Sequence, residues 1–169
     1  AMTYCSTAFS VINANLKPIL VDTEFLSPNI DINKIKKKIN KKTKVIMPVH
    51  LYGSVTNIHE IKKIIKNKKI FIIDDCAQAH GAKDNNGNMV GSLADISTFS
   101  FYPGKNLGAY GESGCAITNN KKINDKIVKL RNWGQSKKHY HDEISYNYRM
   151  DGIQGAILNV KLKKMNEWI

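Results

Sequence analysis

The stretch IFIIDDCAQAH, residues 70–80, decides the fold class of this chain. It opens with four apolar residues, three of them isoleucine, and closes that run with two acids. A short apolar run of this kind indicates a strand buried on both faces, as in a parallel sheet covered by helices. We therefore predict a strand over Ile70–Asp74. Its acidic end, Asp74 and Asp75, would lie at the carboxyl edge of the sheet, where ligands bind in such folds.

The segments on either side alternate between strand-like and helix-like patterns. Helices are predicted where apolar residues recur every three or four positions, and strands where short apolar runs stand between polar turns. The predicted helices are Ser6–Asn15, Asp31–Asn40, Asn57–Lys66, Lys121–Trp133 and Gly152–Trp168, and the other predicted strands are Lys17–Asp22, Lys44–His50, Ile96–Phe101 and Gly114–Thr118. A turn is expected at 84–88, where DNNGN is typical of a hairpin tip. This order predicts an α/β fold: a mostly parallel sheet with helices on both faces.

The composition is that of an ordinary globular protein of one domain. The chain has 169 residues, of which 42% are hydrophobic and 24% charged, and this mix argues against disorder. The formal net charge is +12, but only Arg131 and Arg149 among the 26 basic residues are arginines. Because nucleic-acid recognition favours the arginine fork, a solvated lysine-rich surface explains the charge better than binding to nucleic acid. A general attraction for anionic ligands stays open.

Neither a membrane segment nor a disulfide framework is indicated. No apolar run approaches the roughly 20 residues of a membrane-spanning helix, and the opening AMTYCSTAF lacks the regions of a signal peptide. The cysteines Cys5, Cys76 and Cys115 are too scattered for a disulfide framework or a Cys-x-x-Cys metal site. His139 and His141 have no acid or cysteine spaced to complete a metal site. We expect a cytoplasmic protein without a metal.

A second segment places one lysine in an unusual setting. The predicted strand ISTFSF, 96–101, runs into the loop YPGKNLGAYGESG, 102–114. Lys105 has no charged residue within the four positions before it, whereas most lysines of the chain have a lysine or an acid nearby. A lysine in a glycine-rich, partly apolar loop at a strand end is a candidate nucleophile toward a carbonyl group. A third polar cluster, YNYRM at 146–150, precedes the last predicted helix.

These segments together resemble the motifs of one family. FIIDDCAQAHGA, VGSLADISTFSFYPGKNLGAYGESG, RNWG and YNYRMDGIQGAIL are similar, in order and spacing, to successive motifs of the DegT/DnrJ/StrS family, and TYCSTAFSVINANLKPILVDT resembles its segment ahead of the second strand of the large domain. The resemblance covers essentially the whole chain. It implies a fold-type-I aminotransferase of polysaccharide biosynthesis, acting as a homodimer. Such an enzyme uses pyridoxal 5′-phosphate (PLP) to move an amino group, with glutamate as the expected donor, onto a nucleotide-linked keto-sugar.

The resemblance implies a catalytic role for Lys105 and a cofactor-binding role for Asp75. Lys105 would bond covalently to PLP as a Schiff base and then shuttle a proton between the substrate carbon and the cofactor. Asp75 would lie against the pyridine nitrogen, where a carboxylate keeps the ring protonated and makes it a better electron sink. Some members of the family carry histidine in place of the lysine and act as dehydratases, and Lys105 argues against that branch.

The resemblance implies binding roles for four further residues. Gln78 would hydrogen-bond the ring hydroxyl of the cofactor, and Ser100 would contact its phosphate. Tyr4 stands where the family places an aromatic ring stacked on the cofactor. Asn147 would reach across a dimer interface to the phosphate in the partner subunit.

Each assignment has a plainer alternative. The alternatives are a surface lysine at Lys105, a helix cap at Asp75, unremarkable polar residues at Gln78 and Ser100, a core aromatic at Tyr4 and a turn residue at Asn147. Two other functions also stay open: a regulatory binding protein that kept this fold without catalysis, and a nucleic-acid binder that uses the basic charge.

The chain is shorter than the pattern it resembles. We expect residues 1–169 to be the central part of the PLP-binding large domain, without its N-terminal segment and without the C-terminal small domain. Such a part is expected to be inactive by itself. The strands of such a sheet need helices on both faces, so the absence of the N-terminal segment should leave apolar surface exposed. We expect this at Ile19, Ile46 and Ile72.

Overall fold

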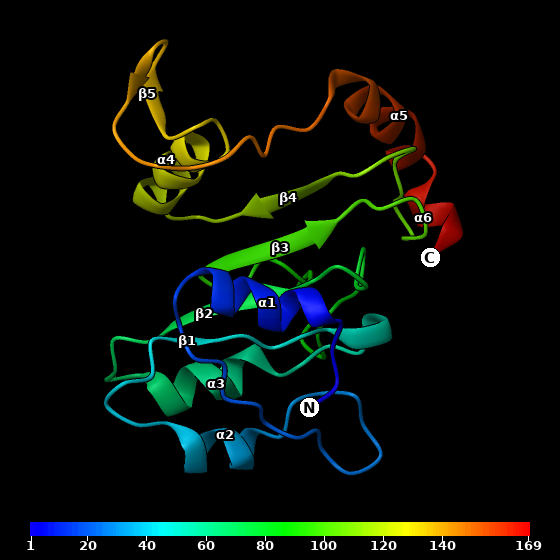
Figure 1. Cartoon of the computed structure of the whole chain (residues 1–169). Helices are drawn as coiled ribbons and strands as arrows, with labels where there is room; N and C mark the ends of the chain where they lie inside the picture. Colours follow the sequence, from blue (N-terminus) through cyan, green and yellow to red (C-terminus); the bar gives the residue numbers. More distant parts are fainter.

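A four-stranded sheet forms the centre of the computed structural model, which describes residues 1–169 (Figure 1). The strands lie in the order β1 (Val45–Ile46), β2 (Phe71–Asp75), β3 (Ile96–Ser100) and β4 (Gly114–Ile117). β1, β2 and β3 are parallel, and β4 is antiparallel to β3. The prediction of an α/β fold with a mostly parallel sheet is therefore confirmed.

The predicted helices are all present, with small changes at their ends. They are α1 (Cys5–Asn13), α2 (Ile32–Lys38), α3 (Ile58–Ile65), α4 (Lys121–Leu130), α5 (Gly152–Leu162) and α6 (Met165–Trp168), and a short 3-10 turn, η1, covers Leu51–Gly53. Asn57 caps α3 by accepting a hydrogen bond from the N–H of Glu60, as its position predicts. The last predicted helix is divided into α5 and α6. A hairpin of β5 (Gln135–Lys137) and β6 (Tyr140–His141), which the sequence did not indicate, follows α4.

Two strand predictions need correction. Residues 17–22 form no strand, since no neighbouring strand pairs with them: Pro18 has no N–H to donate, and the Leu20 carbonyl accepts from the Lys38 ammonium at 2.6 Å. Of Lys44–His50, only Val45–Ile46 is a strand, because Pro48 interrupts the ladder. Val49 still forms an isolated parallel bridge with Asp75, so the chain continues along the edge of β2.

The main core lies between β1, β2 and the helices α2 and α3. It is built from seven buried isoleucines: Ile35, Ile46, Ile58, Ile61, Ile65, Ile70 and Ile72. The expectation that Ile46 and Ile72 would be exposed is therefore wrong, because α3 covers them. Ile19, in contrast, is exposed as expected.

Helices cover opposite faces of β2. Side chains alternate along a strand, so Ile72 and Asp74 point to one face while Ile73 and Asp75 point to the other. Ile72 packs in the core with α3, and Asp75 is hydrogen-bonded to Thr7 of α1. Figure 1 shows α1 and α3 on different sides of the sheet.

The loop after β3 has a support of its own. Leu107 and Ala109 of this loop pack with Leu158 of α5, and Phe101 and Met165 complete the cluster. The loop that carries Lys105 is therefore fixed between the sheet and the last helices, at the right of Figure 1. None of the helices combines the length and the apolar character that a bilayer crossing requires.

The isoleucine core is expected to provide much of the stability. Replacing Ile61, which is fully buried, by alanine should lower the free energy of unfolding by about 2–5 kcal/mol, since it leaves a cavity between α3 and the sheet. Ile144→Ala makes the same chemical change at a fully exposed position and should stay within about 0.5 kcal/mol. Urea unfolding of the two variants measures the difference, and equal effects would contradict this position for the core.

Candidate active site

The carboxylate of Asp75 is held at the carboxyl end of β2 by two donors. The Thr7 hydroxyl donates to Oδ2 at 2.8 Å, and the backbone N–H of Ala77 donates to Oδ1 at 3.0 Å. Thr7 is itself hydrogen-bonded to Thr3 at 2.7 Å. Each carboxylate oxygen retains a lone pair for one more donor. Asp75 is therefore oriented by the chain and still able to accept a hydrogen bond from a ligand. Sequence reasoning missed Thr7, although it stands one helical turn after Tyr4.

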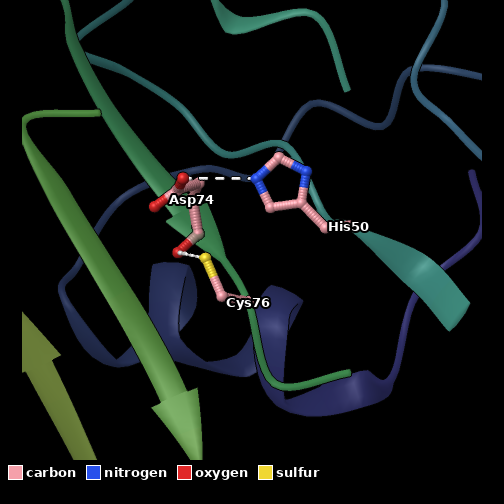
Figure 2. Close-up of side chains that lie close together, drawn as sticks. All are labelled: His50, Asp74 and Cys76. Carbon is pink, nitrogen blue, oxygen red and sulfur yellow. Dashed lines mark hydrogen bonds and ion pairs between the residues drawn. The ribbon is translucent and has the colours of Figure 1, made fainter. Parts of the chain in front are cut away.

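The neighbouring acid, Asp74, belongs to a buried network on the other face (Figure 2). Its Oδ2 lies 3.2 Å from Nε2 of His50, and both side chains are only 1% exposed. The backbone N–H of Thr56 donates to Nδ1 of His50 at 3.0 Å, so that nitrogen carries no proton. The proton must then be on Nε2, from which it is donated to Asp74. The pair is thus a hydrogen bond between a neutral imidazole and a carboxyl group.

Cys76 completes this cluster, which has the spacing but not the chemistry of a metal site. Ligand atoms of His50, Asp74 and Cys76 lie within 4.8 Å of one another. Both ring nitrogens of His50, however, already have partners. Burial raises the pKa of the Cys76 thiol far above its ordinary range, and the charge of Asp74 adds to this, so the thiol keeps its proton. The cluster therefore acts as a structural network.

This network fixes the loop that follows β1. The backbone N–H of His50 donates to the carbonyl of Asp75 at 3.0 Å, while the His50 ring holds Thr56 at the far end of the loop. Residues 51–55, which include η1, are therefore attached at both ends to the end of β2. The sequence offered one signal for His50, because it ends the predicted strand KVIMPVH at the ligand-binding edge.

Lys105 and Gln78 line one pocket of about 460 Å³, together with Tyr52, His80 and Asn106. The Lys105 amine makes no hydrogen bond or ion pair within the chain, whose residues are all described. Gln78 accepts a hydrogen bond from the backbone N–H of Tyr52 at 3.0 Å through Oε1. Its Nε2 is therefore left to donate to a ligand. A larger apolar hollow between α1 and the sheet contains neither Lys105 nor Gln78.

Of the other predicted residues, Ser100 lies at the end of β3, whereas Tyr4 and Asn147 are exposed. Ser100 ends β3, two residues beyond the partner of Asp75, and its Oγ accepts from the N–H of Tyr102 at 3.2 Å. Its own hydroxyl proton is left to donate. Tyr4 directly precedes α1 and is exposed, which makes the alternative of a core aromatic wrong. Asn147 is also exposed; it bridges to Asn132 and is not brought to the other residues within this chain.

His80 is a buried histidine without a hydrogen-bond partner. It is 4% exposed, lies against the rings of Phe99 and Phe101 at 5.5 and 5.9 Å, and neither ring nitrogen is hydrogen-bonded. Burial lowers the pKa of His80 and the positive charge of Lys105 lowers it further, although the nearby backbone of Ser100 opposes the shift. His80 is therefore a neutral group beside the pocket. Nothing in the sequence pattern set it apart.

The fold and this edge of the sheet define the class of protein. An α/β domain that brings a lysine amine, a carboxylate and an amide donor beyond the ends of parallel strands is built to bind a ligand there. The chain belongs to the DegT/DnrJ/EryC1/StrS aminotransferase family, whose model matches residues 1–169. The resemblance found in the sequence is thus confirmed.

Two relatives show how similar sequences are named. The chain is 42% identical over 168 residues to the "Pleiotropic regulatory protein" of Geobacillus stearothermophilus. The aligned residues make up 99% of this chain and 45% of that protein. It is 42% identical over 165 residues to the dTDP-3-amino-3,6-dideoxy-alpha-D-galactopyranose transaminase of Aneurinibacillus thermoaerophilus, covering 98% of this chain and 45% of the relative.

Solved structures share the fold closely. DesV of S. venezuelae, in complex with a ketimine intermediate, matches with a TM-score of 0.94 at 31% identity, over 98% of this chain and 44% of that one. NtdA of Bacillus subtilis, with bound cofactor PMP, matches with a TM-score of 0.90 at 31% identity, over 99% of this chain and 38% of that one. The chain therefore spans less than half the length of each of these proteins.

The residues present fit the ring end of a PLP molecule. Asp75 offers acceptor lone pairs for a protonated ring nitrogen, the Nε2 of Gln78 is a free donor, and Lys105 is a free amine. The phosphate end is less complete, because Ser100 is the one predicted phosphate donor that this chain brings to the same edge. The donor set thus agrees with PLP chemistry.

The lowered pKa of His80 predicts that the chain loses stability in acid. The unfolded state takes up a proton on this histidine near pH 6.5, while the folded state binds it at lower pH. The stability that comes from a neutral His80 is therefore complete above about pH 6.5 and is lost as pH falls through the folded pKa. His80→Leu should reduce the loss between pH 6.5 and 5.5, by at most about 1.4 kcal/mol.

Urea unfolding at the two pH values measures this effect. His139→Asn removes an exposed histidine at a left-handed position that asparagine tolerates, and it serves as the control. An acid loss in His80→Leu equal to that of the unsubstituted chain would contradict the prediction.

Proposed function

We propose that this chain is part of an enzyme that transfers an amino group, with PLP as cofactor, from glutamate to a keto-sugar linked to a nucleoside diphosphate. The observation that carries the proposal is the Lys105 amine, unpaired in a pocket that it shares with Gln78. The family match, the transaminase name of one relative and the PMP bound in NtdA support it. The net charge of +12 suits a diphosphate substrate.

Three residues of the chain would have separate roles in this reaction. Bound PLP supplies an electron sink that stabilises negative charge on the carbon from which a proton is removed. Lys105 would hold the cofactor through Nζ before the substrate binds, and once the substrate amine had displaced it, the freed Nζ would carry the proton to and from the reacting carbon. Asp75, oriented by Thr7 and Ala77, accepts from the ring nitrogen and keeps it protonated. Gln78 would donate from Nε2 to the ring hydroxyl of the cofactor, because its Oε1 is already bonded to Tyr52.

The phosphate end leads us to propose a homodimer. A phosphate with nearly two negative charges needs several converging donors, and within one chain Ser100 is the predicted one. Asn147 is exposed, and its bridge within the chain is to Asn132, so it would act from a partner subunit. The 169 residues by themselves are accordingly expected to bind PLP weakly and to be inactive. Its three free cysteines agree with a reducing compartment such as the cytoplasm.

A regulatory binding protein is the second candidate function. The observation that favours it is the name of the relative from Geobacillus stearothermophilus, which is as similar to this chain as the transaminase is. Addition of PLP separates the two candidates, because covalent attachment to a lysine produces absorbance in the visible range. A protein that binds nucleotide sugars without this absorbance would favour regulation.

Lys105 is predicted to be the residue that attaches the cofactor. Lys105→Ala should abolish amino transfer and visible absorbance, because no other amine lines the pocket, while the free energy of unfolding changes by less than about 1 kcal/mol. The measurement should use the longest natural polypeptide that contains these residues. Borohydride reduction and peptide mapping should label Lys105, and Lys138→Ala, at an exposed position, is the control. Labelling of another lysine would overturn the assignment.

Asp75 is predicted to act through its negative charge. Asp75→Asn keeps the shape and one oxygen, so turnover should fall on the order of 10²–10³-fold. The free energy of unfolding should change by less than about 1.5 kcal/mol, since the remaining oxygen can accept from Ala77 and the Thr7 hydroxyl can rotate to accept from the new amide. Asp74→Asn is the matched control on the opposite face; it should affect stability more and turnover less. Near-normal turnover in Asp75→Asn would show that the carboxylate is not the partner of the ring nitrogen.

A further inference from the structure

Tyr52 is held in a backbone conformation that tyrosine rarely adopts. Its φ and ψ are 56° and 25°, in the left-handed region that favours glycine. Two contacts maintain this conformation: the Tyr52 N–H donates to Oε1 of Gln78 at 3.0 Å, and the N–H of Ser54 donates to the Leu51 carbonyl at 2.9 Å. The unfavourable conformation is therefore stabilised from outside the residue, by a side chain of the candidate site.

The buried network below the loop supports the same conformation. His50 and Thr56, at the two ends of the loop, are joined by the hydrogen bond to Nδ1, and His50 is fixed in turn by Asp74. Because these groups are buried at the end of β2, the loop has a firm base. Tyr52 is thus presented at a defined place rather than on a freely moving loop.

The side chain of Tyr52 is not part of the hydrophobic core. Tyr52 is 73% exposed, yet it lines the pocket that contains Lys105. Strain that is maintained beside a reactive group commonly serves ligand binding. Leu26 provides a contrast, because it is also left-handed, at φ 57°, and 91% exposed, but it lies outside that pocket.

We propose that Tyr52 is a specificity residue whose ring packs against the sugar of the nucleotide-linked substrate. This inference rests on the proposed function. Lys105 would carry a proton to the carbon of the keto group, and that carbon belongs to the sugar. The part of the substrate that shares the pocket with Lys105 is therefore the sugar rather than the nucleotide. A tyrosine ring offers an apolar face to the C–H groups of a sugar and a hydroxyl to its oxygens. The orientation of Gln78 toward the cofactor and that of Tyr52 toward the sugar depend on the same hydrogen bond.

The test uses variants that keep the backbone conformation and remove the ring. Tyr52→Gly and Tyr52→Asn both tolerate the left-handed region, so their thermal midpoints should be equal to or above that of the unsubstituted protein. Tyr52→Phe keeps the aromatic face. Leu26→Gly relieves the same kind of strain away from the pocket and is the matched control.

Calorimetric titration of the PLP-loaded protein, as the longest natural polypeptide that contains this chain, gives the readout. The probes are dTDP-glucose, UDP-N-acetylglucosamine and GDP-mannose, each compared with its nucleoside diphosphate alone. Tyr52→Gly and Tyr52→Asn should weaken binding of the nucleotide sugar by about 10-fold. Binding of the diphosphate should change by less than about 2-fold, and Tyr52→Phe should stay within about 3-fold for the sugar. Leu26→Gly should alter neither.

Three results would overturn the inference. The first is unchanged sugar binding in both ring-free variants, and the second is an equal loss for the sugar and the diphosphate. The third is binding of none of the probes by the unsubstituted protein, which would also remove the proposed substrate class. To distinguish a failure of the Tyr52 inference from a failure of the proposed amino transfer, the unsubstituted protein is mixed with glutamate alone. A change in cofactor absorbance then upholds amino transfer even where Tyr52 fails.

Discussion

Two consecutive acids at the end of a strand must point to opposite faces of its sheet, and the candidate site depends on this constraint. On one face Asp74 meets His50 in a buried hydrogen bond, which attaches the loop after β1 to β2. On the other face Asp75 meets Thr7, which joins α1 to the same strand end. A single dipeptide thereby connects three segments that are distant in the sequence. The pairing of β2 with β1 and β3 fixes the orientation of the strand, and with it the faces to which the two acids point.

The polar groups at this end of the sheet share one property. Asp75, Gln78 and Ser100, which lie at or just beyond the ends of β2 and β3, each use part of their hydrogen-bonding capacity on the chain and leave the rest free. A group that is half satisfied in this way has a fixed orientation before a ligand arrives, which lowers the entropy lost on binding. Lys105 differs, since its amine has no partner at all. His80 differs again: burial, with a smaller contribution from the charge of Lys105, lowers its pKa and keeps it neutral, so it adds no second positive charge to the pocket.

Family membership and function rest on different observations. Closely similar relatives are named as a transaminase and as a regulatory protein, so the shared frame does not by itself decide between catalysis and regulation. What favours catalysis is the side chains, above all the free amine of Lys105 in a pocket with Gln78, and the carboxylate of Asp75 that Thr7 and Ala77 orient. The chain spans less than half of its relatives, and the strand β4, exposed along its whole length, shows how much of the sheet these residues leave uncovered.

The sequence by itself determined the α/β class and the positions of the helices, and its resemblance to the family predicted the residues that are proposed to carry the chemistry. The reason is local: isoleucine spacing, caps such as Asn57 and apolar runs that end in acids need no distant partner to be recognised. Only the tertiary structure decided which apolar runs became strands. Residues 17–22 look like a strand but find no neighbour, whereas Ile46 and Ile72 are buried because α3 happens to cover them. It alone also revealed the roles of Thr7 and Tyr52 and the partners of His50, because a hydrogen bond between residues dozens of positions apart, or a left-handed tyrosine, cannot be recognised in the order of residues.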